Sequence, residues 1–481
     1  MRMVGWLADA LWCPWLLGLF LAVGLVYSAG SGFFQLFGWR LWWRTTAGAL
    51  FRKREGDKGG LSSLQALATA LAATMGTGSI AGVAAALTLG GPGSVFWMWV
   101  SALLGMMTSC GEKLLSVAYQ RPGPDGTLRG GPMYYLRDGL GSPLLAGWFC
   151  LACLPATLAG GSLVQAASMA DSLEAALSLP RLPVGLAIAA LAGLVMVGGL
   201  GRIARVSAAL VPAMALLYLG AGAAVLVCNA GRVPAALELI VSCALDPRAA
   251  LGGGVGWTVA AAMRYGVARG VFTNEAGLGT SAMAHGAAGV DHPARQGMWG
   301  IFEVFLSTLA VCTVTALAIL VSGVWDPAGP LTGAPLTAAA FGSALGPAGE
   351  GAVALSLLLF AFSSILGWSY YGQQCLDFLT GGRGVRLYRA AFLACALAGA
   401  VWDDPAPVWQ LVDLCNALMA LPNLAALLLL APRALSLLDQ WRTLPTFNIK
   451  KRRDFTRAEY DKMKSAGQIP YSRSGRGKLS P

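Results

Sequence analysis

The stretch Leu64–Leu89, LQALATALAATMGTGSIAGVAAALTL, constrains the fold of this chain more than any other. It is uncharged and almost wholly apolar, and at about 1.5 Å per residue it can cross a bilayer core of about 30 Å. Its middle nevertheless holds Gly76, Thr77, Gly78 and Ser79, although glycine costs a helix roughly 1 kcal/mol relative to alanine. Two interpretations fit: a close helix crossing through small side chains, or a broken helix whose free amides and carbonyls face an ion and a solute.

The composition extends this membrane character to the whole chain. Of 481 residues, 56% are hydrophobic and 12% are charged, whereas soluble domains carry about 25% charged residues. Long apolar runs recur from end to end, so the sequence predicts an all-α polytopic membrane protein that sits in a lipid bilayer. The net charge of +11 lies mostly in loops and in the tail, which favours membrane orientation over nucleic-acid binding.

The distribution of cysteine and histidine predicts no catalytic or metal centre. The one close cysteine pair, Cys150 and Cys153, has no second half-site, and the two histidines, His285 and His292, flank a loop. We therefore expect neither an enzyme nor a resident cofactor. We also expect no cleavable signal, because the first apolar run, Leu11–Phe37, is too long for one.

The apolar runs predict about eleven membrane spans. A surface helix is expected over Val233–Ala244, and a re-entrant or lid helix over Pro335–Leu345. The predicted spans are Leu11–Phe37, Leu64–Leu89, Pro92–Tyr119, Leu144–Leu177, Pro183–Leu200, Val206–Cys228, Gly256–Gly289, Met298–Ser322, Gly351–Leu379, Leu387–Val401 and Val408–Ala431.

Lysine and arginine in the loops predict the orientation. The basic residues gather in alternate connections, whereas the connections 90–91, 322–346 and 402–407 hold none. The positive-inside rule then places the N-terminus outside and the tail in the cytoplasm. The basic loop residues are Arg40, Arg44, Arg52, Lys53, Arg54, Lys58, Arg121, Arg129, Arg137, Arg202, Arg205, Arg383 and Arg386.

The span Gly256–Gly289 is the second polar one, because it contains Arg264, Arg269, Asn274 and Glu275 between glycines. A charge at the bilayer centre costs about 2.5–3.5 kcal/mol or more, so these residues must face a partner or a watery cavity. This pattern predicts a second interrupted helix.

The two interrupted spans are five positions apart in the order of spans. Spans two to six and seven to eleven then form two five-helix halves of opposite orientation, with a binding site where the breaks meet near the midplane. The expected organisation is an N-terminal helix and basic loop over 1–60, a transporter core over 61–432 with repeats at about 61–230 and 255–432, and a basic cytoplasmic tail over 433–481.

Five long motifs carry a resemblance to a known family. They read MGTGSIAGVAAALTLGGPGSVFWMWVSALLGM, GGPMYYLRDGLG, RYGVARGVFTNEAGLGTSAMAHGAA, FEVFLSTLAVCTVTALAILVSG and FSSILGWSYYG. Together they resemble the prokaryotic alanine/glycine:cation symporter family, over residues 60 to 430. The resemblance implies the five-plus-five amino-acid transporter fold with one extra N-terminal helix, in the prokaryotic inner (plasma) membrane. It also implies transport of alanine or glycine with sodium, in some members with protons.

The resemblance also suggests where the substrate binds. Amides at the start of a half-helix suit a carboxylate, so we expect the backbone amides of Gly78 and Ser79 to bind it, with Gln165 as a further donor. Gly76 and Thr77, in the same break, are also expected to contact the substrate. A lone intramembrane glutamine is otherwise explained by a helix-to-helix hydrogen bond.

The family pattern assigns the remaining groups of the substrate to the second break and to a later span. The ammonium group is expected near Phe272, Thr273 and Asn274, and Phe272 and Trp368 are expected to enclose the side chain. Aromatic residues in a span otherwise serve packing or the membrane interface.

Sodium, the coupling ion, is expected between the second and ninth spans. The matching oxygens are backbone carbonyls near Thr74 and Thr77 and the hydroxyls of Ser363 and Ser364. Adjacent serines on a helix point about 100° apart, so one of the two could instead bond back to its own helix.

This chain departs from the family pattern at Ser79, where asparagine is usual, at Ser307, where an acid is usual, and at Gln373, where glutamate is usual. Each departure bears on substrate choice or on proton coupling. Two intramembrane acids remain, Glu275 and Glu303, and pairing with Arg264 or Arg269 is the favoured explanation for them.

The sequence therefore predicts sodium-coupled uptake of a small neutral amino acid by alternating access. Alternatives are a sodium-independent or proton-coupled carrier of the same fold, or a carrier of another neutral amino acid such as serine or glutamine. A channel or a binding sensor is a different class, and two interrupted helices are not typical of a channel lined by rings of identical charges.

Overall fold

The computed structural model describes residues 2–49, 60–123, 126–245, 258–402 and 406–443. These residues form a helical bundle, and β1 (Arg121–Pro122) pairs with β2 (Leu128–Arg129) in a short hairpin. The α-helices are α1 (Arg2–Leu11), α2 (Pro14–Gly30), α3 (Phe34–Phe37), α4 (Trp39–Thr45), α5 (Ser63–Thr74), α6 (Ala81–Gly90), α7 (Gly93–Ala118), α8 (Pro132–Tyr134), α9 (Pro143–Leu158), α10 (Val164–Leu177), α11 (Arg181–Val197), α12 (Gly199–Cys228), α13 (Val233–Leu245), α14 (Val259–Asn274), α15 (Thr280–His285), α16 (Pro293–Val304), α17 (Thr313–Ser322), α18 (Gly333–Leu345), α19 (Pro347–Thr380), α20 (Val385–Val401), α21 (Ala406–Leu429) and α22 (Ala431–Arg442).

Within this described part, six helices are long and apolar enough to cross a membrane. Four further apolar helices are shorter, among them both halves of the first interrupted span. The six are Gly93–Ala118, Pro143–Leu177, Gly199–Cys228, Pro293–Ser322, Pro347–Thr380 and Val408–Leu429. These helices agree with the predicted all-α polytopic membrane protein.

The first interrupted span is a broken helix, as one of the two interpretations predicted. A capping box formed by Ser62 and Gln65 starts α5, and the helix ends at Thr74. A single 3-10 turn, η2 (Thr77–Ser79), separates it from α6. Glycine lowers helix stability here, so the chain leaves the helix at the Gly-Thr-Gly run rather than at a membrane surface.

The second interrupted span also breaks, between α14 and α15. Glu275 ends α14 in the left-handed region at φ 53°, and Gly277 and Gly279 follow at φ 95° and 84°. Glycine adopts such angles without a steric penalty, which explains why the two glycines stand directly after the polar cluster.

Two other long segments contain a π-helical turn. The turn η4 (Ala159–Leu163) joins α9 to α10, and η7 (Phe305–Cys312) joins α16 to α17. A π-turn inside an α-helix is often found at a functional site. Here η4 includes Gly160, which faces the cavity described below.

The start of α5 lies beside the end of α15. The amide of Leu61 donates to the Ala287 carbonyl at 2.9 Å, and the amide of Gly289 donates to the Leu61 carbonyl at 3.1 Å. Since α5 also packs against α15, and α6 packs against α14, the two broken helices run side by side in opposite directions.

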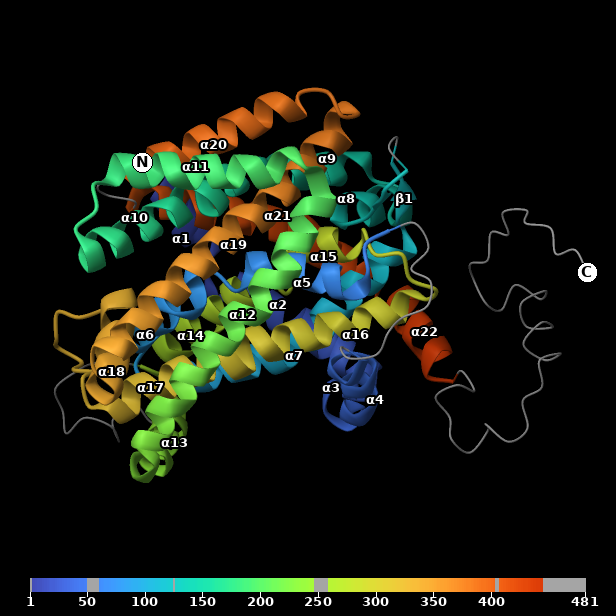
Figure 1. Ribbon diagram of the computed structural model, residues 1–481. Helices are drawn as coiled ribbons and strands as arrows, with labels where there is room; N and C mark the ends of the chain where they lie inside the picture. The colour runs from blue at the N-terminus through green and yellow to red at the C-terminus, as the bar shows by residue number, and fades with distance from the viewer. Residues whose placement is uncertain (1, 50–59, 124–125, 246–257, 403–405, 444–481) are drawn as a thin grey trace, which may run out of the picture.

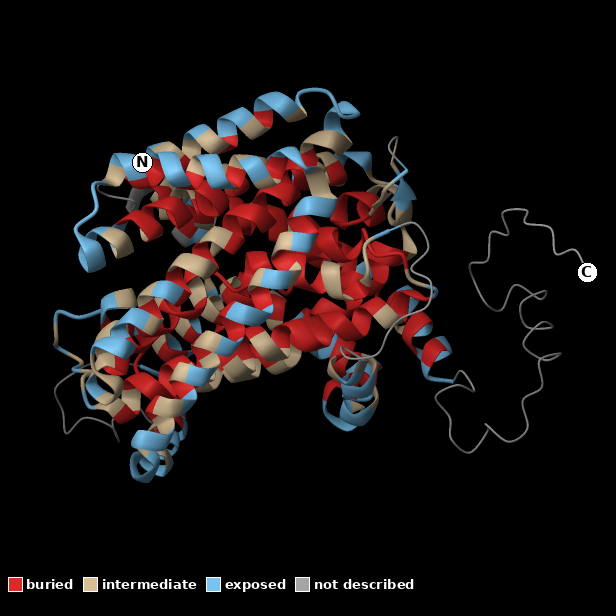
Figure 2. Ribbon diagram, viewed as in Figure 1, coloured by how far each residue is buried: buried red, intermediate tan, exposed pale blue. Residues whose placement is uncertain are grey.

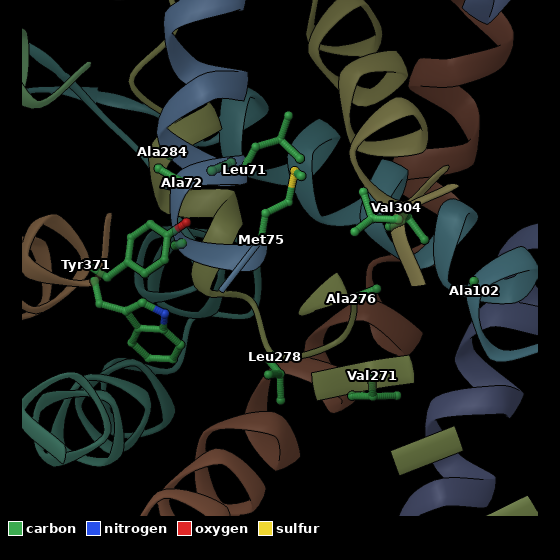
Figure 3. Packing of buried hydrophobic residues seen from close by; sticks show 14 of the residues in the cluster. Leu71, Ala72, Met75, Ala102, Val271, Ala276, Leu278, Ala284, Val304 and Tyr371 are labelled. Atoms are coloured by element: carbon green, nitrogen blue, oxygen red, sulfur yellow. The ribbon is translucent and has the colours of Figure 1, made fainter. Parts of the chain in front are cut away.

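Around these two helices the bundle is built from long packed pairs. Helix α7 packs against α14 and α16, α19 packs against α9, α10 and α12, and α11 pairs with α20 at the top of Figure 1. Buried residues concentrate in the centre, and exposed residues lie along the outer faces of α11, α12 and α20 (Figure 2). Figure 3 shows Leu71 and Met75 of the first broken helix in the same packed region as Ala276, Leu278 and Val304.

Arginine-rich connections gather at the right of Figure 1, near α8, the β hairpin and α22. Arg121 and Arg137 pair with Asp138, and Arg129 pairs with Asp377 near the end of α19. Hydrogen bonds from Arg137 and Arg121 lower the pKa of the Asp138 carboxyl in this connection. The connection that contains α18 and the turn from α6 to α7 lie at the opposite end.

One predicted boundary is wrong. The first span was expected to reach Phe37, but α2 ends at Gly30, because the amide of Phe33 bonds back to the Ser28 carbonyl while Gly32 and Phe33 adopt positive φ. Helix α22 runs across position 432, where the core is predicted to end, and packs against α7 and α16. Residues 444–481 of the predicted tail lie outside the described residues.

Candidate binding site at the two helix breaks

A small cavity lies where the two broken helices meet. Its walls come from both breaks and from α10, α19 and α21. The cavity volume is about 20 Å³, close to what one or two water molecules need, so an amino acid can enter only if the walls move apart. The lining residues are Ala73, Thr74, Gly76, Thr77, Gly78, Gly160, Gln165, Phe272, Glu275, Leu278, Trp368, Val412 and Asn416.

The first break presents unpaired backbone amides. Within the described residues, the amides of Gly76, Thr77 and Gly78 donate to no protein acceptor, whereas the amide of Ser79 donates to the Gly76 carbonyl at 3.2 Å. A buried unpaired amide is costly, and consecutive free amides at the start of a half-helix form an anion site. Of the two amides predicted to bind the carboxylate, that of Ser79 is therefore engaged within the break, while that of Gly78 is among the unpaired amides of the described residues.

Close packing explains why the break is glycine-rich. A Cβ atom on Gly76 would lie 2.8 Å from Ser364 Oγ and 3.7 Å from Gln165 Oε1. A Cβ atom on Gly78 would lie 3.2 Å from the Phe272 ring. The backbone of the first break thus lies directly between α10, α14 and α19, with no room for a side chain at position 76.

Gln165 and Trp368 face the cavity from opposite helices. The amide nitrogen of Gln165 donates to the Gly160 carbonyl at 3.2 Å, while its buried Oε1 has no partner among the described residues. Trp368 lies against Gly161, where a Cβ atom would come within 2.2 Å of the Trp368 Cβ. Gly161 therefore lets Trp368 approach the η4 turn closely.

The second break is held by side chains from neighbouring helices. The amide of Gly277 donates to Glu112 Oε1 at 2.9 Å, and Asn423 Nδ2 donates to Glu112 Oε1 and to the Gly277 carbonyl, each at 2.8 Å. Tyr135 in turn donates to the Asn423 side-chain oxygen. These bonds replace the helical bonds that the chain loses between α14 and α15, so the break is rigidly placed.

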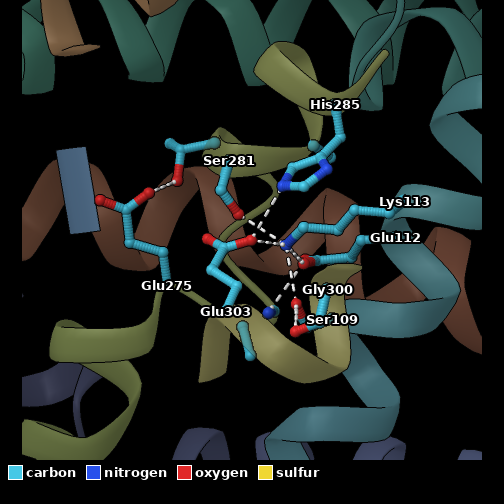
Figure 4. A network of polar contacts seen from close by, with 12 residues as sticks. Ser109, Glu112, Lys113, Glu275, Ser281, His285, Gly300 and Glu303 are labelled. Atoms are coloured by element: carbon cyan, nitrogen blue, oxygen red, sulfur yellow. Dashed lines mark hydrogen bonds and ion pairs between the residues drawn. The ribbon is translucent and has the colours of Figure 1, made fainter. Parts of the chain in front are cut away.

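A buried charged network extends from this support (Figure 4). The ammonium of Lys113 lies 3.5 Å from Glu112 Oε2 and 3.4 Å from Glu303 Oε2, and the three side chains are 0% exposed. It also donates to Ser109 and Ser281, at 2.8 and 2.6 Å. The network joins α7 to α15 and α16.

His285 completes the network at Glu303. Its Nε2 lies 3.1 Å from Glu303 Oε2, and Gln296 Nε2 lies 2.6 Å from its Nδ1. If Gln296 donates to Nδ1, the ring proton lies on Nε2 and is donated to Glu303. His285 is therefore a buried partner of a carboxylate rather than a loop residue.

The serine pair on α19 meets the end of α5. Ser363 Oγ donates to the Ala72 carbonyl at 3.1 Å and to the Phe360 carbonyl at 2.9 Å. Ser364 Oγ lies 3.1 Å from the Ala72 carbonyl and 3.3 Å from the Ala73 carbonyl. The hydroxyls and these carbonyls are the hard oxygen ligands that a sodium ion takes, and α5 ends one residue later, at Thr74.

A sequence comparison decides the family. The model of the sodium:alanine symporter family matches residues 1–454. The chain belongs to the sodium:alanine symporter family. This agrees with the resemblance seen in the motifs and with the multi-pass helical structure.

Several members of this family are similar over most of their length. An uncharacterized transporter of Haemophilus influenzae is 42% identical over 420 residues, which cover 87% of this chain and 91% of the relative. A sodium/alanine symporter of Methanococcus maripaludis is 41% identical over 87% and 92% of the two chains, and a probable sodium/glutamine symporter of Bacillus subtilis is 35% identical over 89% and 88%. A mutant manganese transporter of Eremococcus coleocola aligns with a TM-score of 0.48 at 14% identity over 84% of each chain.

In this member of the family, six of the nine predicted substrate residues line the cavity, namely Gly76, Thr77, Gly78, Gln165, Phe272 and Trp368. Ser79, Thr273 and Asn274 are buried but do not line it. The Thr273 hydroxyl donates to its own helix at the Arg269 carbonyl, and Asn274 lines a separate small pocket against α2 and α7. Of the predicted sodium residues, Thr74 and Thr77 line the cavity, Ser364 lies against Gly76, and Ser363 donates to the Ala72 carbonyl.

The expected pairing of the intramembrane acids is wrong. Among the described residues, Glu303 contacts Lys113 and His285, and Glu275 hydrogen-bonds Thr280. The arginines stack instead on the rings of Tyr265 and Phe272. They lie earlier on α14, partly exposed, because long cationic side chains reach outward more easily than acids.

Sequence reasoning missed Lys113 and Asn416 as residues of the membrane interior. Glu112 and Lys113 stand in the last third of the predicted span Pro92–Tyr119, yet both are 0% exposed. An adjacent acid and base inside an apolar run was the available signal, because such charges are buried only with partners. Asn416 and Asn423 offered a weaker signal, as single amides in the last span.

The structure explains one of the three departures from the family pattern. Gln373 accepts from Arg389 Nε at 2.8 Å and donates to the Ser369 carbonyl at 3.0 Å, so a neutral side chain is fully paired there. Ser307 is buried beside Thr308, and the Ser79 hydroxyl is buried without a partner among the described residues. Nothing in the structure explains the last two.

Proposed function

We propose that this protein is a secondary active transporter that couples sodium influx to the uptake of a small neutral amino acid, alanine or glycine. The observation that carries the proposal is the meeting of two broken helices at one cavity, with unpaired amides on one side and oxygen ligands on the other. Membership of the sodium:alanine symporter family supports it. The relative named as a sodium/alanine symporter supports alanine.

The proposed architecture is the inverted five-plus-five repeat. Reciprocal contacts support it: α10 contacts α20 as α11 contacts α19, and α9 contacts α21 as α12 contacts α19. In such a repeat, the fourth, fifth and sixth predicted spans correspond to the ninth, tenth and eleventh. Replacing each span by its counterpart converts the first contact of each pair into the second. The opposite directions of the two broken helices support the same twofold relation.

In the proposed binding mode, the amides of Gly76, Thr77 and Gly78 hold the substrate carboxylate, with Gln165 beside them. Carbonyls around Phe272 receive the ammonium group, and Phe272 and Trp368 enclose the methyl group. Sodium binds between the serine pair on α19 and the carbonyls at the end of α5. Gly76 lies against both Ser364 and Gln165, which lets one backbone segment respond to both solutes.

Alternating access follows if the helices around the breaks rock against α9, α10, α19 and α20. Moving one charge inward across about 100 mV supplies roughly 2.3 kcal/mol, and a tenfold sodium gradient adds about 1.4 kcal/mol. One sodium ion could therefore support accumulation of several hundredfold. We place the protein in the prokaryotic inner membrane with the arginine-rich end in the cytoplasm and the N-terminus outside.

The test is uptake of labelled alanine by proteoliposomes that contain the purified protein. We expect accumulation with an inward sodium gradient, stimulation by an inside-negative potential, and loss of accumulation when choline replaces sodium. Unlabelled glycine, serine and glutamine rank the substrates by competition. Equal accumulation in choline would reject sodium coupling, and its loss on collapse of a proton gradient would instead support the proton-coupled alternative.

Replacing Gln165 by methionine should raise the alanine concentration for half-maximal uptake by about tenfold or more, because a donor to a charged carboxylate contributes about 1.5–3 kcal/mol. The sodium concentration for half-maximal uptake should change much less. Gln410→Met is the matched control, since Gln410 is exposed on α21. An unchanged alanine dependence would remove Gln165 from the site.

A further inference from the structure

Among the residues that the structure describes, Glu275 is the one carboxylate that lines the cavity. It is 2% exposed, and its hydrogen-bond partner is the hydroxyl of Thr280. Within the described residues, no lysine, arginine or histidine nitrogen lies within ion-pair distance of it. A buried carboxylate is costly to keep charged without a cation, so Glu275 either holds a proton or pairs with a cation that enters the cavity.

Lys113, the cation of the buried charged network, does not pair with Glu275. Lys113 lies between Glu112 and Glu303 and donates to Ser109 and Ser281 (Figure 4). In the same view Glu275 points away from Lys113. The ammonium of Lys113 is therefore committed to two other acids.

Oxygen atoms without donors face the same cavity. Thr74 Oγ1, Thr77 Oγ1, Gln165 Oε1 and Asn416 Oδ1 are all buried and have no hydrogen-bond partner among the described residues. All four residues line the cavity with Glu275. A set of unpaired oxygens beside a carboxylate is the environment that a small, hard cation prefers.

The backbone at Glu275 adds an independent observation. Its φ of 53° is one of three positive values among the described residues other than glycine. Such an angle is strained for a residue with a Cβ atom, and glycine would avoid that strain. The chain keeps a glutamate there, which indicates that the side chain is needed at the cavity wall.

We propose that Glu275, with the oxygens of Thr74 and Asn416, forms a cation subsite inside the cavity, distinct from the serine pair on α19. Its ligand is a small monovalent cation held by oxygen atoms. Two sources share this chemistry: a second sodium ion, and the ammonium group of the amino acid. The inference rests on the proposed function, because both cations are ligands of that transporter.

The test measures binding by purified wild type and Glu275→Gln, with ²²Na⁺ in the absence of amino acid and labelled alanine at saturating sodium. If the subsite holds sodium, the substitution lowers sodium affinity by about tenfold or more, or removes part of the bound sodium. If it holds the ammonium group, sodium affinity is unchanged and alanine affinity falls by about tenfold or more. Glu275→Asp should retain more affinity than Glu275→Gln, because it keeps the charge.

Glu350→Gln is the matched control, since Glu350 is an exposed acid at the start of α19. If Glu275→Gln binds sodium and alanine with wild-type affinity, the proposed subsite is rejected. Glu275 is then a neutral acid with a structural role only. If that variant does not fold, Asn416→Leu serves instead, with the same expected loss and the same overturning result. Wild-type protein that binds neither sodium nor alanine would reject the proposed function itself, so the two failures are distinguishable.

Discussion

Replacing Lys113 by methionine should leave a protein that unfolds at a markedly lower temperature and is poorly recovered from the membrane. The side chain is 0% exposed and lies between Glu112 and Glu303, at 3.5 and 3.4 Å. Methionine fills a similar volume but leaves two buried carboxylates without their shared cation. Removing one partner of a buried ion pair costs about 3–5 kcal/mol, which is a large part of the stability of an ordinary domain.

The effect should reach the binding site as well as the fold. Glu112 also accepts the amide of Gly277, so a carboxylate that moves or takes up a proton no longer fixes the second helix break. We therefore expect the fraction of Lys113→Met protein that does fold to transport alanine poorly. Thermal unfolding in detergent and uptake per folded molecule are the two measurements.

A compensating variant tests the cause. Lys113→Met combined with Glu303→Gln removes one of the two uncompensated acids, so it should be more stable than Lys113→Met alone. Lys113→Arg keeps the charge and should lose less stability than methionine, although the larger head must be accommodated. A Lys113→Met protein with the wild-type unfolding temperature would show that the network contributes nothing to the fold.

The two helix breaks could be predicted from sequence because their cause is local. Gly76, Gly78, Gly277 and Gly279 weaken the helix where they stand, and the predicted breaks lie at these residues. The long helices were predicted for a similar reason, since the length of each apolar run fixes the length of each span. The end of α2 was not predicted, because it depends on one turn at Gly32 and Phe33 inside a continuous apolar run.

The partners of the buried charges could not be predicted in this way. Glu303 lies far along the chain from Lys113, and the nearest arginine in sequence is Arg295, which pairs with Asp291 instead. Only the packing of α7 against α16 brings the lysine to the acid. The same limit applies to the cavity: Gln165 and Trp368 came from the family motifs, whereas Glu275 and Asn416 became candidates once five segments met around one space.

Replacing Ser364 by alanine should raise the sodium concentration for half-maximal uptake by about tenfold, and replacing Ser363 as well should raise it further. Each substitution removes one hard oxygen at the junction of α19 with the end of α5, and a bond to a charged group contributes about 1.5–3 kcal/mol. Each 1.4 kcal/mol corresponds to about a factor of ten in affinity. At saturating sodium, the alanine dependence should return close to that of the wild type.

Ser356→Ala is the matched control for this prediction. Ser356 is also a buried serine of α19, and its hydroxyl has no partner among the described residues. The same loss of a hydroxyl should leave its sodium dependence unchanged, which separates a sodium ligand from a general effect on the helix. If Ser363 and Ser364 behave like Ser356, the hydroxyls only hold α19 against the Ala72 and Ala73 carbonyls, and the coupling ion must bind elsewhere, with Glu275 as the next group to examine.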